Sequence, residues 1–138
     1  MKNILIDSCF WIALYYERDG NHNIAKQTWK ALEDYNLILP FPTLYEFIDT
    51  RFVKRIDIKE SFNKVLKNPK NFKIGDVKYK DNAIFKLFES NYHTYSLVDL
   101  IIREMILDTN LNINGLITYN KKDFLDVCSI RNVEIYSG

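Results

Sequence analysis

Four acidic residues and one amide stand where the sequence predicts that a strand ends or a helix begins: Asp7, Glu46, Asp99, Asn120 and Asp123. Asp7 closes the apolar run 4–6, and each of the other three acids lies three residues after a Thr, Ser or Asn, which are common at helix N-caps. In a parallel α/β sheet such positions can meet at one edge. Carboxylates about 5 Å apart repel by about 3 kcal/mol per pair at an effective dielectric constant of about 20, so a cluster of them needs a compensating charge. A divalent metal ion is the obvious candidate.

The elements that must position these residues alternate along the chain. Short, mostly apolar runs predict strands at 3–6, 37–39, 72–77, 115–118 and 133–136. Apolar residues at helical spacing predict helices at 10–16, 22–35, 44–52, 58–66, 82–88, 97–106 and 123–127. This alternation implies right-handed crossovers, and therefore an α/β fold in which helices cover both faces of a central, mostly parallel sheet, a three-layer α/β/α sandwich. Ligands of such folds bind beyond the carboxyl ends of the strands, where the acids are expected.

The size, composition and charge of the chain limit its possible functions. A chain of 138 residues with 47% hydrophobic residues and no linker or repeat predicts one domain spanning 1–138. Its longest apolar run, 10–16, is far shorter than the ~20 residues needed to span a bilayer, and no signal-peptide core is present, so we expect a cytoplasmic protein without membrane association. The net charge of +1 gives no overall attraction to nucleic acid. Basic contacts must be local, and the candidates are Arg51, Lys54, Arg55, Lys121 and Lys122.

Three of the four acids also have a purely structural interpretation. In a capping box, the acid three residues after the cap reaches back to the cap's backbone N–H, and this could apply to Glu46, Asp99 and Asp123. Asp7 is harder to explain in this way, because Ser8 is expected to cap the following helix. A carboxylate that ends a buried strand is destabilising unless it is paired or binds a metal. The position of all four acids at the same kind of junction favours a shared site.

The successive segments 4–8, 44–47, 95–102 and 116–124 resemble the signatures of PIN-domain nucleases, especially the VapC-like toxin ribonucleases. The most specific pieces are Ser-Leu-Val-Asp in the third segment and Thr-Tyr-Asn-Lys-Lys-Asp-Phe in the fourth. The resemblance covers nearly the whole chain and implies a PIN-like fold. It also implies a ribonuclease that binds Mg²⁺ or Mn²⁺ and cleaves RNA, with an antitoxin protein as a partner.

The resemblance carries over to individual residues. Asp7, Glu46 and Asp99 match the first three acids of the family and are implied metal ligands. Two residues compete for the fourth acidic position of the family. Asn120 stands where many members have Asp, and Asp123 follows three residues later. The implied metal ligands are therefore Asp7, Glu46, Asp99 and Asp123, with Asn120 as a further catalytic candidate.

The chemistry of these side chains supports the same roles. Mg²⁺ and Mn²⁺ prefer hard oxygen ligands and retain several waters, so three or four carboxylates are enough to hold one or two ions. Asp7 and Asp99 are expected as direct ligands, and Glu46 as a ligand or as the group that orients the attacking water. Polar side chains nearby are expected to position water, phosphate or the RNA backbone: Thr118, Asn120, Lys121 and Lys122.

Other interpretations remain open. A PIN-like nuclease of RNA processing or defence would need no antitoxin. A catalytically degenerate binding module would use the acids only as caps, and Asn120 supports it. An aspartyl-phosphate phosphatase would use Asp7 as its nucleophile, but Cys9 stands where that family has a second Asp. The apolar helix 10–16 and the aromatic helix 44–52 could also form a homodimer.

Overall fold

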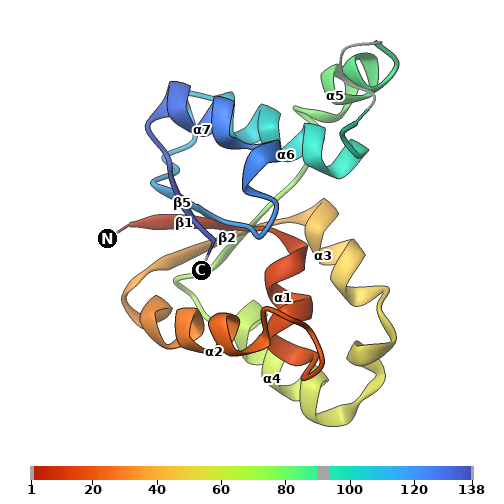
Figure 1. The fold of residues 1–138 in the computed structure, drawn as a ribbon, viewed down its shortest axis with the longest axis vertical. Helices are drawn as coiled ribbons and strands as arrows, with labels where there is room; N and C mark the ends of the chain where they lie inside the picture. The colour runs from red at the N-terminus through yellow and green to blue at the C-terminus, as the bar shows by residue number, and fades with distance from the viewer. Residues whose placement is uncertain (1, 90–93, 138) are drawn as a thin grey trace.

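A five-stranded parallel sheet forms the centre of the protein in the computed structural model, which describes residues 2–89 and 94–137 (Figure 1). The strands are β1 (Asn3–Ile6), β2 (Asn36–Pro40), β3 (Phe72–Ile74), β4 (Gly115–Ile117) and β5 (Glu134–Tyr136). Their order is β3-β2-β1-β4-β5, and every pairing is parallel. β1 therefore lies at the centre, and the residues that follow it lie between the carboxyl ends of β2 and β4.

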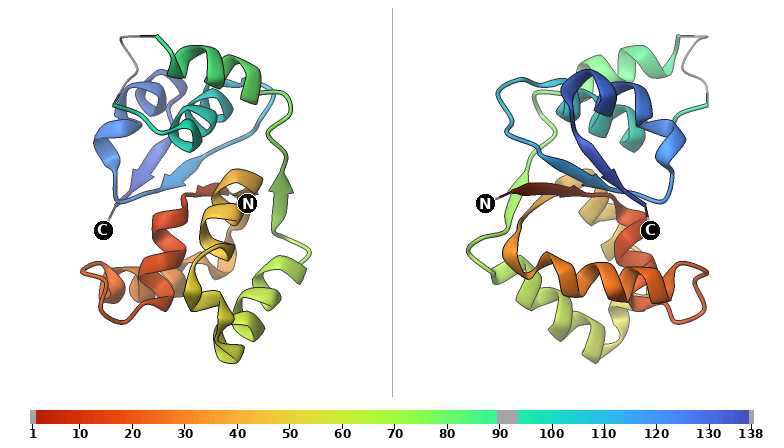
Figure 2. Two further views of the ribbon diagram at one scale, coloured as in Figure 1. Left: turned by 90° about the vertical axis from the view of Figure 1, so that its right-hand side faces the viewer. Right: turned by 60° about the vertical axis from the view of Figure 1, so that its left-hand side comes forward.

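Helices cover both faces of the sheet, with α1 to α4 on one face and α5 to α7 on the other (Figure 2). The α-helices are α1 (Ser8–Tyr15), α2 (His22–Ala31), α3 (Phe41–Ile48), α4 (Ile56–Lys67), α5 (Lys80–Leu87), α6 (Leu97–Leu107) and α7 (Leu125–Arg131). The short 3₁₀ helices are η1 (Leu32–Asp34), η2 (Arg51–Lys54) and η4 (Lys121–Asp123). The predicted three-layer α/β/α sandwich is confirmed.

Alternate residues of the central strand supply the two cores. Ile4 and Ile6 are fully buried against the layer of α1 to α4, whereas Leu5 is buried against the layer of α5 to α7. Side chains of a strand point alternately to its two faces, so a strand covered on both sides must be continuously apolar. The run 4–6 meets this requirement, and Asp7 is the first polar residue after it.

The start of α3 differs from the sequence prediction. β2 extends to Pro40, which is also the N-cap of α3, and Pro42 lies within the first turn, where a missing N–H is tolerated. Thr43 is therefore inside the helix, where its buried hydroxyl donates a hydrogen bond to the carbonyl of Pro40 at 2.8 Å. Glu46 lies beyond the first turn, so the capping-box interpretation of Thr43 and Glu46 is wrong.

Several of the apolar side chains of helix α1 are buried in the core of the protein. Phe10 and Trp11 are fully buried, and the Trp11 ring contacts the rings of Trp29 and Phe62 at centroid distances of 5.7 and 5.0 Å. Large exposed apolar side chains lie elsewhere, including Tyr45 on α3, which is 62% exposed. Self-association remains a prediction, and α3 offers a more accessible surface for it than Phe10 or Trp11. Within the described residues, no helix is long and apolar enough to cross a membrane.

Candidate active site

Asp7 is a buried carboxylate at the carboxyl end of β1, with only 4% of its surface exposed. One carboxylate oxygen accepts a hydrogen bond from the backbone N–H of Ser8 at 2.8 Å, and the other accepts one from the Thr118 hydroxyl at 2.9 Å. Asp7 is the N-cap of α1. The expectation that Ser8 caps this helix, and that Asp7 has no helix to cap, is wrong, because α1 begins directly after the strand.

The environment of Asp7 disfavours its charged form. The pKa of Asp7 is raised from 3.8 to about 6, chiefly by burial; the hydrogen bond from Thr118 opposes this rise, and the charge of Asp99 adds to it. The thiol of Cys9 also lies 3.5 Å from the Oδ2 atom of Asp7. The three hydrogen bonds that Asp7 accepts, from Ser8, Cys9 and Thr118, do not fully offset this desolvation. The site therefore favours a proton, or another cation, at Asp7.

Glu46 is connected to Asp7 through Ser8. The hydroxyl of Ser8 donates a hydrogen bond to the Oε1 atom of Glu46 at 2.7 Å. Glu46 is exposed on α3, whereas Ser8 is the first residue of α1 and follows Asp7 directly. The contact thus joins α3 to the end of β1. Sequence reasoning assigned Ser8 only a capping role and missed this contact.

Asp99 forms the capping box that the sequence predicted. Its backbone N–H donates to the hydroxyl of Ser96 at 3.1 Å, and its Oδ2 atom accepts from the backbone N–H of Ser96 at 3.4 Å. Partial burial raises the pKa of Asp99 most, and the charge of Asp123 adds to this rise, while the Ser96 bonds and the charge of Arg103 lower it. Asp99 thus belongs to the capping box of α6, whose N-cap is Ser96, and it also lies within the electrostatic range of Asp7 and Asp123.

The segment that follows β4 brings the remaining candidates to the same edge. Thr118 is fully buried, and its hydroxyl accepts a hydrogen bond from the backbone N–H of Asn120 at 3.1 Å while it donates to Asp7. Asn120 precedes η4 without a side-chain cap bond. Lys121 and Lys122 are exposed, as expected of residues that contact a substrate.

Asp123 ends η4, and its carboxylate makes no hydrogen bond within the described residues; its backbone carbonyl accepts one from Arg103 at 2.8 Å. The described part of the chain also contains no lysine or arginine that pairs directly with any of the four candidate acids. Among the described residues, hydrogen bonds and the more distant charge of Arg103 oppose the negative charge at this edge.

The acids approach one another without forming a closed set of ligands. Hydrogen bonds connect Asp7 with Thr118 and Ser8 with Glu46, and electrostatic coupling connects Asp7 with Asp99 and Asp99 with Asp123. No three His, Cys, Asp or Glu side chains within residues 2–89 and 94–137 lie close enough to hold a metal ion together. The direct metal-ligand roles from sequence remain predictions.

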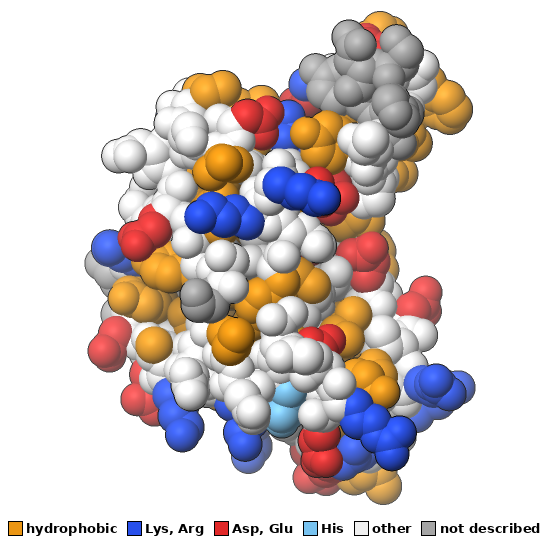
Figure 3. Space-filling model, in the orientation of Figure 1, with side chains coloured by type: hydrophobic (Ala, Val, Ile, Leu, Met, Phe, Trp, Pro, Cys, Tyr) orange, Lys and Arg blue, Asp and Glu red, His pale blue; other side chains and the backbone are white. Residues whose placement is uncertain are grey.

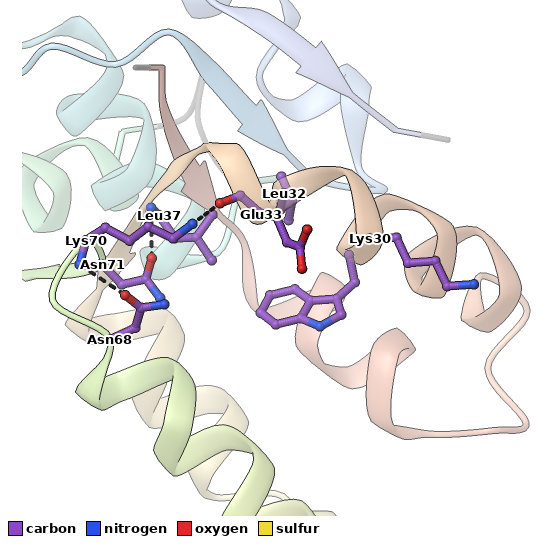
Figure 4. A pocket seen from close by; sticks show the side chains of 8 residues that line it. Lys30, Leu32, Glu33, Leu37, Asn68, Lys70 and Asn71 are labelled. Atoms are coloured by element: carbon purple, nitrogen blue, oxygen red, sulfur yellow. Dashed lines mark hydrogen bonds between the residues drawn. The ribbon is translucent and has the colours of Figure 1, made fainter.

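The cavity shown in Figure 4 lies near the amino ends of β2 and β3, whereas the candidate acids lie at the carboxyl ends of the strands. Its volume is about 380 Å³, and it lies beside the start of β2, between the end of α2 and the loop before β3. Its lining residues are Trp29, Lys30, Leu32, Glu33, Leu37, Asn68, Lys70 and Asn71. Glu33 is the only acid among them, and Lys70 donates a hydrogen bond to its backbone carbonyl. This cavity is separate from the acidic edge.

The charge of the surface is mixed. Figure 3 shows basic and acidic side chains interspersed over one face of the molecule, in keeping with the net charge of +1. Contacts with a polyanion would therefore depend on a few local side chains such as Lys121 and Lys122.

Comparisons with known proteins agree with this arrangement. The family model of the PIN domain matches residues 4–129. No curated protein matches the sequence significantly. The crystal structure of VapC20 from Mycobacterium tuberculosis superposes with a TM-score of 0.65 at 18% sequence identity, covering 82% of this chain and 86% of that one. At this identity the likeness shows the fold alone. The family predicted from the sequence motifs is nevertheless confirmed, since the family model spans most of the chain: this protein belongs to the PIN domain family.

Proposed function

We propose that the protein is a Mg²⁺- or Mn²⁺-dependent endoribonuclease and the toxin of a toxin–antitoxin pair. The observation that carries the proposal is Asp7, a buried carboxylate at the carboxyl edge of the sheet, with no direct basic partner among the described residues and with Asp99 close enough to raise its pKa. An uncompensated buried carboxylate is destabilising, and a divalent cation would offset its charge.

The donor set is chemically suitable for such an ion. The candidate side chains present only hard oxygen atoms, which Mg²⁺ and Mn²⁺ prefer over sulfur or nitrogen. Mg²⁺ is commonly held by one or two carboxylates together with waters, so the incomplete convergence of the four acids does not exclude it. When bound, the metal would polarise the scissile phosphate and stabilise the charge that develops on its oxygens.

Separate roles follow for the residues of the chain. Asp7 and Asp99 would hold the ion, because hydrogen bonds at a helix N-terminus fix both: Asp7 is the N-cap of α1, and Asp99 belongs to the capping box of α6. Glu46, held by the hydroxyl of Ser8, would orient the attacking water. Asp123 completes the set better than Asn120, because it offers a carboxylate rather than an amide, and that carboxylate has no hydrogen bond within the described residues.

Two alternative functions use the same acidic residues. The capping box of Asp99 favours a degenerate binding module, in which the acids only stabilise helix ends. A PIN-like nuclease of RNA processing or defence would use the same site without an antitoxin. Metal-dependent cleavage separates both nucleases from the binding module, and a neighbouring reading frame for a small DNA-binding antitoxin separates the toxin from the processing enzyme.

The decisive experiment is RNA cleavage. VapC20 is described as a toxin that cleaves the sarcin-ricin loop, so a ribosomal RNA fragment with that loop is a suitable first substrate beside total cellular RNA. We expect cleavage with Mg²⁺ or Mn²⁺, none with EDTA, and none by Asp7→Asn with either metal. Cleavage that persists in EDTA or in Asp7→Asn would refute the proposed mechanism.

A further inference from the structure

Arg103 is a nearly buried cation one helical turn after Asp99. It lies on α6 with 9% of its surface exposed, and residues four apart in a helix lie on the same face. Its Nη1 atom donates to the backbone carbonyl of Asp123 at 2.8 Å. Its guanidinium also donates to both carboxylate oxygens of Asp126, at 2.7 and 2.8 Å.

The guanidinium thus joins three segments beside the acidic edge. It belongs to α6 and donates hydrogen bonds to the end of η4 and to the start of α7. Its central carbon lies 4.5 Å from the ring centroid of Tyr95, which precedes α6. A planar fork fixed on two sides by a carboxylate and a ring has little freedom to rotate. A lysine ammonium could keep the charge here but not this geometry.

The way in which Arg103 contacts Asp123 suggests its role. It binds the backbone carbonyl of Asp123 and leaves the carboxylate of that residue without a hydrogen bond from the described residues. Its ion pair is formed with Asp126, outside the set of candidate acids. The contact therefore fixes the position of Asp123 without occupying its carboxylate.

We propose that Arg103 is a positioning residue of the acidic site, which holds the segment 120–123 in place opposite Asp99. The proposal rests on the nuclease function proposed above, to which it assigns a residue that does not touch the substrate. It predicts that the shape of Arg103, and not only its charge, is needed for catalysis.

A matched control is available on the neighbouring helix. Arg131 of α7 donates from its Nε atom to the carbonyl of Ile106 on α6 at 3.2 Å, so it also connects α6 to α7. It does so at the other end of both helices, away from Asp99 and Asp123. The substitutions Arg103→Lys and Arg131→Lys therefore each weaken one link between the same two helices, and only the first changes the acidic edge.

The first measurement is the kinetics of RNA cleavage at saturating Mn²⁺, corrected for the folded fraction. Loss of an outer-shell partner commonly reduces activity 10- to 100-fold, so Arg103→Lys should lower kcat at least about tenfold and change KM less than about twofold. Arg131→Lys should leave both within about twofold. Equal kcat values for the two variants would overturn the proposal.

The second measurement is hydrogen exchange in EDTA, which does not depend on activity. The backbone N–H groups of Asp123 and Phe124 donate within the segment, to Asn120 and Lys121, and should exchange at least about tenfold faster in Arg103→Lys but not in Arg131→Lys. Unchanged exchange would overturn the positioning role even if the wild type cleaves RNA. Faster exchange in Arg103→Lys, together with a wild type that cleaves no RNA, would instead support the positioning contact of Arg103 and refute the nuclease function.

A milder variant keeps the test valid if Arg103→Lys does not fold. The side chain of Asp126 is 57% exposed, so Asp126→Asn should fold while it weakens the fixed orientation of Arg103. It should show the same two effects at smaller size, and wild-type values for both kcat and exchange would count against the proposal.

Discussion

The substitution Asp7→Asn tests the charge imbalance at the centre of the site. The pKa of Asp7 rises from 3.8 to about 6, a shift of about 2 units, which corresponds to about 3 kcal/mol. Because the pKa is higher in the folded state than in the unfolded state, the contribution of Asp7 to stability is fully present below about pH 4 and is lost as the pH rises through about 6. In the metal-free wild type we therefore expect the free energy of unfolding to fall by up to about 3 kcal/mol through this group.

The asparagine variant should not undergo this loss. Its amide oxygen can still accept from the N–H of Ser8, and its NH₂ group can donate to the hydroxyl of Thr118, which has a second lone pair beside the one used by Asn120. The changed hydrogen bond costs about 1 kcal/mol. At pH 7.5 in EDTA, Asp7→Asn should therefore be more stable than the wild type by about 2 kcal/mol, which raises Tm by about 6 °C.

Urea denaturation at pH 4.5 and pH 7.5 measures this difference, first in EDTA and then in Mn²⁺. At one hundred times its dissociation constant the ion should stabilise the wild type by about 2.7 kcal/mol, and the variant should gain much less. Asp57→Asn is a suitable control, because Asp57 is exposed and its pKa is lowered by Arg55 rather than raised. A metal-free Asp7→Asn no more stable than the wild type at pH 7.5 would refute the desolvation argument, and equal stabilisation by Mn²⁺ would remove Asp7 from the site.

Three further predictions follow from the geometry. Asp99→Asn should abolish both RNA cleavage and the stabilisation by Mn²⁺. Ser96→Ala, which removes the cap of α6, should lower the free energy of unfolding by about 1 kcal/mol but retain cleavage and stabilisation by Mn²⁺. Thermal melts of the two variants in EDTA and in Mn²⁺ distinguish these outcomes. Ser8→Ala frees Glu46 and should lower kcat about 10- to 100-fold while stability changes by less than about 1 kcal/mol; an unchanged kcat would exclude Ser8 from positioning Glu46. Replacing Lys121 or Lys122 with Ala should reduce the slope of log affinity for single-stranded RNA against log salt by up to about 0.7 each, and an unchanged slope would mean that neither contacts phosphate.

The sheet and the edge that carries the acids could be predicted because both depend on local sequence. A strand buried on both faces must be continuously apolar, so the run 4–6 indicates β1, and the acid after it marks the end of that strand. The N-terminus of α6 could also be predicted, because Ser96 and Asp99 lie three residues apart and form the capping box that this spacing predicts.

The errors arose where local signals conflict or where the partner is distant in sequence. Pro40 ends β2 and also caps α3, so the helix starts before the Thr that resembled its cap. The bond between Ser8 and Glu46 spans 38 residues, and that between Arg103 and Asp126 spans 23. Within a helix whose apolar residues set the periodicity, an isolated arginine such as Arg103 carries no sign that it is buried, since only the fold supplies its partners.

The structural and the functional interpretations of the acids are not alternatives for Asp7 and Asp99. Each lies at a helix N-terminus, Asp7 at α1 and Asp99 at α6, where the helix dipole stabilises a negative charge by about 0.3–1 kcal/mol. The raised pKa of Asp7 corresponds to a net cost of about 3 kcal/mol for its charged form, so the helix ends offset only part of the unfavourable energy. Capping thus fixes the two carboxylates in position and leaves an excess of negative charge between them. A divalent cation, which carries twice the charge of a proton and binds oxygen, would offset this excess more effectively than hydrogen bonds alone.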